Sequence, residues 1–319
     1  MKKTISRRDF LKMVGFGSLA LATRGVYPAV SGGGPFGGGE PDLAVAENGS
    51  PGEMVRAAVR AMGGINRFIK RGKSVVVKPN IAWARPPSDA ANTNPEVVAE
   101  IVKLCYEGGA SEVIVMDHTC NNCVMTYEKS GIKAAALRAN AVVKRADRRE
   151  YYEKVSLPKG RVLKECEVLK EILEAGAMIN VPVVKVHGGA KVTLSMKNLM
   201  GTVWDRGAFH RSGLHECIAE LSTYVKPDLI IMDAVRILTT RGPQGPGKVL
   251  SPRKVAAGTD PVALDAYGTG ILGRKARDIP HIVYAHKLGV GRINLARLNI
   301  RTIDLAKVGW RMQLEELFA

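Results

Sequence analysis

The sequence predicts an α/β protein with a mostly parallel sheet flanked by helices. Apolar, β-branched runs alternate with helical patterns along most of the chain, which is the pattern of a parallel sheet covered by helices. Of the 319 residues, 46% are hydrophobic and 24% are charged, which is enough for one large or two modest cores. This composition excludes disordered and fibrous proteins. A transmembrane bundle is also excluded, because only the N-terminus contains an apolar run that could enter a bilayer.

The first half of the folded region predicts alternating strands and helices. Residues 74–78 read as a buried strand, and a Pro-rich loop follows through Pro87. Thr93-Asn-Pro-Glu96 supplies N-cap chemistry for a helix running to about Glu107, and Gly108-Gly109 ends this helix. The remaining elements expected here are strands over 112–116 and 141–144 and a helix over 127–138.

The second half is less regular. Residues 146–160, rich in charge and tyrosine, predict a surface excursion, and a division into two lobes is expected near them. Asp260-Pro261 predicts the start of a helix that runs to about Ile271. The other expected elements are strands over 178–181, 229–232, 254–257 and 298–302, and helices over 165–175, 280–288 and 305–317.

The N-terminus carries the most specific short motif in the chain. Ser6-Arg7-Arg8-Asp9-Phe10-Leu11-Lys12 precedes an apolar stretch, so residues 1–30 predict a twin-arginine signal. A Gly-rich segment follows, from which we expect a linker over 31–52 and an α/β domain over 53–319. Ala44-Val45-Ala46 has a signal-peptidase pattern but lies far from the apolar stretch, which leaves an uncleaved membrane anchor open.

The signal predicts an exported, periplasmic or otherwise extracytoplasmic protein that the twin-arginine translocase carries in its folded state. This route often serves proteins that bind a cofactor or partner before export, which favours a metal or redox role. Lys and Arg total 47 against 30 for Asp and Glu, a formal charge of +17, so an anionic small molecule or an acidic redox partner protein is expected. Nucleic acid is not expected, because aromatic residues are only 5% and no binding module is present.

The densest polar stretch runs from Val184 to His215. Lys185 and His187 alternate at the end of an apolar strand, so they share one face at the strand end, where ligands of parallel sheets bind. Lys197, Asn198 and His210 follow among glycines that allow close approach of the backbone. This combination suits a carboxylate or phosphate ligand, although a solvated basic face has the same composition.

Metal and redox chemistry have weaker signals. His187, His210 and Asp205 are of types that bind metals, but their spacing is not a recognised signature. Cys120-Asn-Asn-Cys123 follows a predicted strand. Three interpretations of these two cysteines are open: a redox pair, a structural disulfide or two unrelated thiols. The chain lacks both a haem-attachment motif and four cysteines spaced for an iron–sulfur cluster.

The segment Gly242-Pro-Gln-Gly-Pro-Gly-Lys248 matches most of a nucleoside-triphosphate loop. Val249 stands at the hydroxyl position, however, and no helix is expected to follow. We therefore interpret it as a turn lining a ligand site, with Arg241 available to an anion.

Blocks of sequence over residues 72–275 resemble the family called domain of unknown function 362. They are Val75-Val-Val-Lys-Pro-Asn80, Thr93-Asn-Pro-Glu96, Gly109-Ala-Ser-Glu-Val-Ile-Val-Met-Asp117, Asn180-Val-Pro-Val-Val-Lys-Val-His187, Leu194-Ser-Met-Lys-Asn-Leu-Met-Gly201, His210, Gly242-Pro243 and Gly258-Thr-Asp-Pro-Val-Ala-Leu-Asp265. The resemblance implies an α/β fold related to that of the lactate racemase group and an association with iron–sulfur or redox proteins. The family's anchor residues match Lys78, Asn80, Lys185, His187, Lys197, Asn198, His210, Asp260 and Asp265.

Three functional hypotheses follow from these residues. In the first, an exported protein binds an anionic ligand, a metal ion or an iron–sulfur cluster. Its lysines at 78, 185 and 197 would neutralise the ligand, the asparagines at 80 and 198 would orient it, and the histidine at 187 or 210 would carry a proton or bind metal. The second hypothesis is a non-catalytic accessory protein of an exported redox complex. The third is a racemase-like or isomerase-like enzyme acting on a small carboxylic acid.

Overall fold

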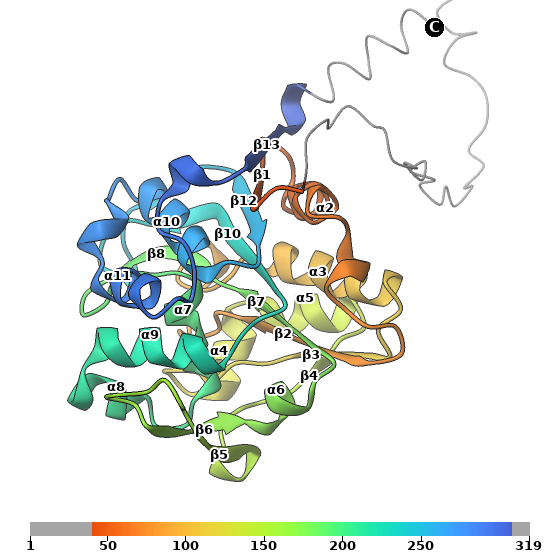
Figure 1. The fold of residues 1–319 in the computed structure, drawn as a ribbon. Coiled ribbons are helices and arrows are strands. Elements are labelled where there is room, and N and C mark those ends of the chain that lie inside the picture. Colours follow the sequence, from red (N-terminus) through yellow and green to blue (C-terminus); the bar gives the residue numbers. More distant parts are fainter. Residues whose placement is uncertain (1–39, 308–319) are drawn as a thin grey trace, which may run out of the picture. The chain divides into compact units, whose positions relative to one another are not determined.

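The computed structural model describes residues 40–307, and Figure 1 shows them as a sheet with helices packed against it. The predicted twin-arginine signal over 1–30 lies outside the described residues, as does most of the helix predicted over 305–317. Within 40–307, none of the helices combines the length and the apolar character that a membrane span requires.

Parallel strands dominate the main sheet, so the predicted fold class is confirmed. The sheet has eleven strands, of which β12 runs antiparallel to its two neighbours, while β10, β7, β2, β3 and β4 run parallel to one another. The main order is β13 (Ile300–Asp304), β1 (Leu43–Glu47), β12 (Lys254–Gly258), β10 (Leu229–Leu238), β7 (Ala177–Val181), β2 (Ser74–Pro79), β3 (Glu112–Val115) and β4 (Val142–Val143). Beside this path lie β8 (Val183–His187), β9 (Lys191–Thr193) and β11 (Val249–Leu250), and β5 (Tyr152–Ser156) and β6 (Glu165–Leu169) form a separate hairpin.

Helices connect the strands and cover the sheet (Figure 1). They are α2 (Pro51–Ala61), α3 (Pro95–Glu107), α4 (Cys123–Lys129), α5 (Ile132–Arg138), α6 (Lys170–Glu174), α7 (Ser195–Asn198), α8 (Arg206–Ser212), α9 (Leu214–Tyr224), α10 (Pro261–Ile271) and α11 (Pro280–Lys287). The start of α3 follows the predicted chemistry, because Asn94 caps the helix and Pro95 occupies its first position.

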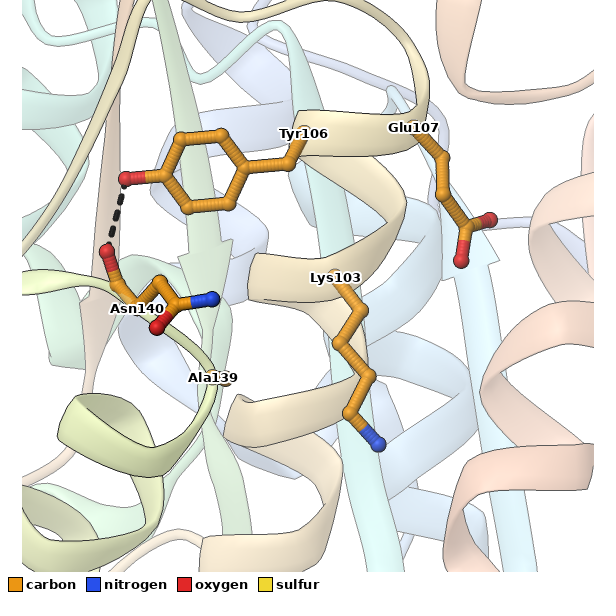
Figure 2. A pocket seen from close by; sticks show the side chains of 5 residues that line it. All are labelled: Lys103, Tyr106, Glu107, Ala139 and Asn140. Atoms are coloured by element: carbon orange, nitrogen blue, oxygen red, sulfur yellow. Dashed lines mark hydrogen bonds between the residues drawn. The ribbon is translucent and has the colours of Figure 1, made fainter. Parts of the chain in front are cut away.

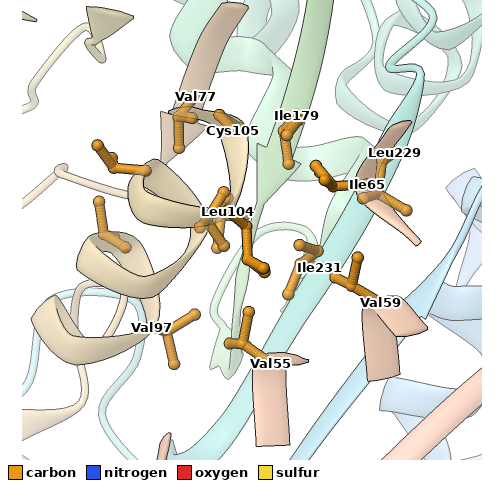
Figure 3. Packing of buried hydrophobic residues seen from close by; sticks show 14 of the residues in the cluster. Val55, Val59, Ile65, Val77, Val97, Leu104, Cys105, Ile179, Leu229 and Ile231 are labelled. Atoms are coloured by element: carbon orange, nitrogen blue, oxygen red, sulfur yellow. The ribbon is translucent and has the colours of Figure 1, made fainter. Parts of the chain in front are cut away.

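The sheet carries a hydrophobic core on each face because successive strand residues point to opposite sides. In β10, Leu229 and Ile231 belong to the core that α2 and α3 cover, whereas Ile230 and Met232 belong to the core under α9, α10 and α11. Figure 3 shows the first core, in which aliphatic side chains from the helices and strands interdigitate. Each fully buried aliphatic side chain of this kind contributes about 1.5–3 kcal/mol to stability.

The folded domain begins before residue 53, where the sequence predicts its start. Residues 43–47 form β1, which pairs with β12 on one side and β13 on the other. The segment Ala44-Val45-Ala46 is fully buried there, so cleavage at this signal-peptidase pattern would remove a strand from the sheet. The linker expected over 31–52 therefore does not extend past Asp42, and composition hid the strand because it is short and follows a glycine-rich run.

Two further predictions are wrong in part. The helix expected over 165–175 is instead β6 followed by the short α6, because β6 pairs with β5 in a hairpin. The helix expected over 127–138 is divided into α4 and α5 at Gly131, whose φ of 72° does not fit a helix.

Residues 40–307 form one compact unit, so the expected division into lobes near 146–160 is not present.

Candidate functional site

Buried polar side chains meet where several parallel strands end. We call this group the strand-end cluster and define it as Lys78, Asn80, Asp117, Asn180, Lys185 and Asn198, all of them buried. Lys78 lies in β2, Asp117 follows β3, and Lys185 lies in β8, which continues from β7. The carboxyl ends of parallel strands reach one edge of a sheet, which explains why residues so distant in sequence come together.

An ion pair is completely enclosed in this cluster. The Lys78 ammonium donates to Asp117 Oδ1 at 2.6 Å and to the Pro79 carbonyl at 3.0 Å. The other carboxylate oxygen of Asp117 accepts the Ile81 backbone N–H at 2.7 Å. Burial lowers the pKa of Lys78, and the adjacent Asp117 carboxylate opposes this change. The charge of Asp117 is therefore already balanced by Lys78.

Three asparagine amides form a chain of hydrogen bonds through the cluster. Asn80 Nδ2 donates to Asn198 Oδ1 at 2.8 Å, and Asn198 Nδ2 donates to Asn180 Oδ1 at 2.8 Å. Asn180 Nδ2 in turn donates to the Ser195 carbonyl at 3.0 Å. This chain fixes the amide orientations and ties α7 to β2 and β7.

Lys185 has only neutral hydrogen-bond partners. Its ammonium donates to Asn80 Oδ1 at 3.0 Å and to the Ala91 carbonyl. Because the side chain is 1% exposed and has no paired carboxylate, burial lowers the pKa of Lys185 to about 7.

Lys197 lies beside the cluster on α7 and is half-buried. Asp265 holds this turn, because its two carboxylate oxygens accept the backbone N–H groups of Ser195 and Met196 at 2.6 and 3.1 Å. Within residues 40–307, no hydrogen bond or ion pair includes the Lys197 ammonium. Burial is the main cause that lowers the pKa of Lys197 to about 8, and the nearby positive charge of Arg206 contributes.

His187 ends β8 as a neutral imidazole. Its Nδ1 accepts the Ala190 backbone N–H at 3.0 Å, which leaves the proton of the neutral ring on Nε2. Burial, together with the charges of Lys197 and Lys185, lowers the pKa of His187 to about 3. The more exposed His210 also lies within reach of Lys197, whose charge and partial burial of the ring lower the pKa of His210. The structure thus brings the predicted residues 185, 187, 197 and 210 into one neighbourhood.

Arg206 completes the basic surroundings and was not singled out by the sequence. Its guanidinium donates to the His118 and Thr119 carbonyls at 2.8 and 2.6 Å, and it lies 3.3 Å from Cys120 Sγ. Asp117 was also missed, because its role depends on contacts with Lys78 and Ile81 in another segment of the chain. Arg206 gives no local signal either, because its position depends on contacts with a loop 86 to 88 residues away in sequence.

Three predicted site residues have structural roles. Asp260 caps α10 by accepting the Ala263 N–H at 2.9 Å and pairs with Arg292. Asp205 caps α8 and pairs with Arg211. Asp265 is close to the cluster but uses both oxygens to hold α7. Helix capping and ligand binding select the same residue type, so sequence alone did not separate them.

The predicted metal set of His187, His210 and Asp205 is not assembled. In the part of the chain that the structure describes, no three His, Cys, Asp or Glu side chains are placed to hold one metal ion.

Arg241 is exposed, with a positive φ of 53°. Its turn packs on β8, because a Cβ at Gly242 would lie 2.0 Å from the Val186 carbonyl oxygen.

The Cys120 and Cys123 thiols are both free and differ in environment. Cys120 is exposed beside Arg206, whereas Cys123 is buried in the core that α2 and α3 cover. Burial raises the pKa of Cys123 to about 11, which keeps this thiol protonated. This difference argues against a C-x-x-C redox pair, because one partner lacks access and thiolate character.

A surface hollow lies at the opposite edge of the sheet. Figure 2 shows its lining by Lys103, Tyr106, Glu107, Ala139 and Asn140. The Tyr106 hydroxyl donates to the Asn140 carbonyl at 2.8 Å, which joins the end of α3 to the segment before β4. These residues precede β3 and β4, so the hollow is separate from the cluster at the strand ends.

Gly201 allows the backbone to approach the buried ion pair. A Cβ at this position would lie 1.9 Å from Asp117 Oδ1 and 2.7 Å from Lys78 Nζ. We therefore expect Gly201→Ala to lower the free energy of unfolding by about 1–3 kcal/mol, measured by urea denaturation. Gly188→Ala is the control, since nothing lies within 4 Å of its Cβ position. Equal stability of the two variants would contradict this packing.

The lowered pKa values of Lys185 and Lys197 predict a pH dependence of stability. The unfolded chain holds these protons up to about 10.5, whereas the folded protein releases them near 7 and 8. The unfolded state therefore binds more protons in this window, and stability rises with pH. We expect the free energy of unfolding to rise less steeply with pH in Lys185→Met than in the wild type. Parallel pH profiles would show that Lys185 is not desolvated.

The chain is similar to known proteins in sequence and in structure. The family model described as "Domain of unknown function (DUF362)" matches residues 75–270. A thylakoid-associated protein from Synechocystis is 29% identical over 263 residues, covering 76% of this chain and 77% of that protein. Two solved structures are similar: a Thermotoga maritima protein (TM-score 0.43, 12% identity, 75% of this chain and 60% of that chain), and the lactate racemase apoprotein from Thermoanaerobacterium thermosaccharolyticum (TM-score 0.40, 14% identity, 78% and 57%).

Proposed function

This chain belongs to the DUF362 family, and from that premise we propose that its α/β domain binds a small anion, such as a carboxylate, at the strand-end cluster. The observation that carries the proposal is an excess of positive charge in a buried place. Lys78, Lys185, Lys197 and Arg206 gather around the single carboxylate of the cluster, Asp117. Lys78 already neutralises that carboxylate.

An ammonium group without a counter-ion is unfavourable in a low-dielectric place. A bound anion would supply the missing negative charge and would form charge-assisted hydrogen bonds with the amines. Lys197 is the residue expected to contact the anion first, because its ammonium is unpaired within 40–307 and its side chain is only half-buried. The neutral His187 beside it would donate a hydrogen bond from its Nε2–H group.

The test is thermal unfolding of the protein at low ionic strength with a panel of small anions. Monocarboxylates, dicarboxylates and inorganic phosphate are compared with the matched neutral amides of the same acids. We expect at least one anion to raise the melting temperature in a saturable way, because a ligand that binds only the folded state stabilises it. Neutral amides should have no effect. Equal shifts for acids and amides, or no shift with any anion, would overturn the proposal.

Export is proposed on separate grounds. The pattern of residues 6–12 predicts a twin-arginine signal, and the similar Synechocystis protein is described as thylakoid-associated. We expect cell fractionation to place the protein outside the cytoplasm and Arg7→Lys/Arg8→Lys to retain it inside. Fractionation that is unchanged by this double variant would overturn the assignment of the signal.

A further inference from the structure

Lys197 differs from the other basic side chains around the strand-end cluster. Lys78 is paired with Asp117, Lys185 donates to Asn80 and Ala91, and the Arg206 guanidinium donates to two backbone carbonyls. The Lys197 ammonium has no such partner among residues 40–307. It is therefore the amine of this group whose nitrogen is available for a new bond.

The backbone that carries Lys197 is held from both sides. Before it, Asp265 accepts the N–H groups of Ser195 and Met196. After it, the Asn198 side chain is fixed by Asn80 and Asn180 at 2.8 Å each. A reactive side chain on a backbone fixed in this way starts from a restricted set of positions, as nucleophilic catalysis requires.

The surroundings of Lys197 favour its neutral form. Burial and the positive charges of Arg206 and Lys78 lower the pKa of this amine to about 8. The unprotonated fraction is therefore about a tenth at pH 7 and about half at pH 8, far above that of an ordinary lysine. A desolvated lysine next to other cations is a recognised type of activated nucleophile.

Building on the proposed anion site, we propose that Lys197 forms an imine with a small carboxylate that also carries an aldehyde or ketone, such as a 2-oxo acid. The neighbouring cations would hold the carboxylate, and the Lys197 nitrogen would attack the carbonyl carbon to form a carbinolamine. Loss of the former carbonyl oxygen as water then gives the imine. The nitrogen loses two protons and the departing oxygen leaves with them as water, so the step needs no oxidant or reductant.

The experiment traps the imine by reduction. The full chain is incubated with pyruvate and cyanoborohydride, and adducts are located by intact-mass and peptide mass spectrometry. We expect one reduced adduct on Lys197, formed faster as the pH rises toward about 8. Lactate, which lacks the carbonyl, and acetone, which lacks the carboxylate, should give no selective adduct.

Two variants separate this proposal from the anion site itself. Lys197→Arg keeps the charge but cannot form the imine, so it should lose the adduct and retain the thermal shift produced by anions. Lys226→Arg, at an exposed position, should behave like the wild type. An adduct on Lys185, or adducts spread over surface lysines, would overturn the role of Lys197. An anion-induced shift without any adduct would overturn the imine alone, whereas the absence of both would overturn the anion site as well.

Discussion

Replacing Lys78 by methionine is expected to lower the free energy of unfolding by about 3–5 kcal/mol, because it leaves a buried carboxylate without its partner. Both members of the pair are enclosed, and the Lys78 ammonium is 2.6 Å from Asp117 Oδ1. After the substitution, the carboxylate would keep the Ile81 N–H as a hydrogen-bond donor but would lose its adjacent positive charge. Urea denaturation at neutral pH measures the change.

The matched control for this variant is Lys73→Met, an exposed lysine just before the same strand, for which we expect a change within about 0.5 kcal/mol. The double variant Lys78→Met/Asp117→Asn should recover part of the loss, since no unpaired charge remains buried. If the double variant were as unstable as the sum of its single changes, the two side chains would not interact as the structure indicates.

Lys197→Gln is expected to weaken anion binding by about 10- to 100-fold, which corresponds to the loss of one hydrogen bond to a charged group. The fold should tolerate this change, because the Lys197 ammonium has no partner within residues 40–307 and its helix is held by Asp265. Isothermal titration calorimetry gives the affinity, and urea denaturation gives the stability of the same preparation.

Lys226→Gln removes an exposed lysine in the loop that follows α9 and should leave the affinity for the anion unchanged. It controls for the general loss of positive charge, which also weakens anion binding at low salt. Equal weakening in the two variants would show that the anion responds to net charge alone. Unchanged affinity in Lys197→Gln would remove this residue from the site.

The parts of the fold that the sequence predicted are those with strong local signals. The strand at 74–78, the helix after Asn94 and the helix after Asp260 combine apolar patterns with capping residues, and the structure confirms all three. The strand at 43–47 depends instead on β12 and β13, which are distant in sequence, and the strand at 165–169 depends on its hairpin partner β5. Local pattern does not contain that information.

The same distinction applies to the candidate site. Lys185 and His187 were found because they alternate at the end of one apolar strand. The roles of Asp117 and Arg206 depend on contacts with other segments of the folded chain. Asp205 is of a residue type that binds metals, but in the structure it caps a helix. The lowered pKa values of Lys185 and Lys197 could not be predicted from the sequence either, because they follow from burial of these side chains in the folded state.

Proton uptake on anion binding tests the central claim most directly. A bound anion stabilises the protonated amines and raises their pKa values, so near pH 8 binding should draw protons from the buffer. Isothermal titration calorimetry in two buffers of different ionisation enthalpy measures this uptake, using the carboxylate that gives the largest thermal shift. The account predicts uptake by the wild type and a smaller uptake by Lys197→Gln. Binding without proton uptake, or with the same uptake in the variant, would contradict a site built on unpaired, desolvated lysines.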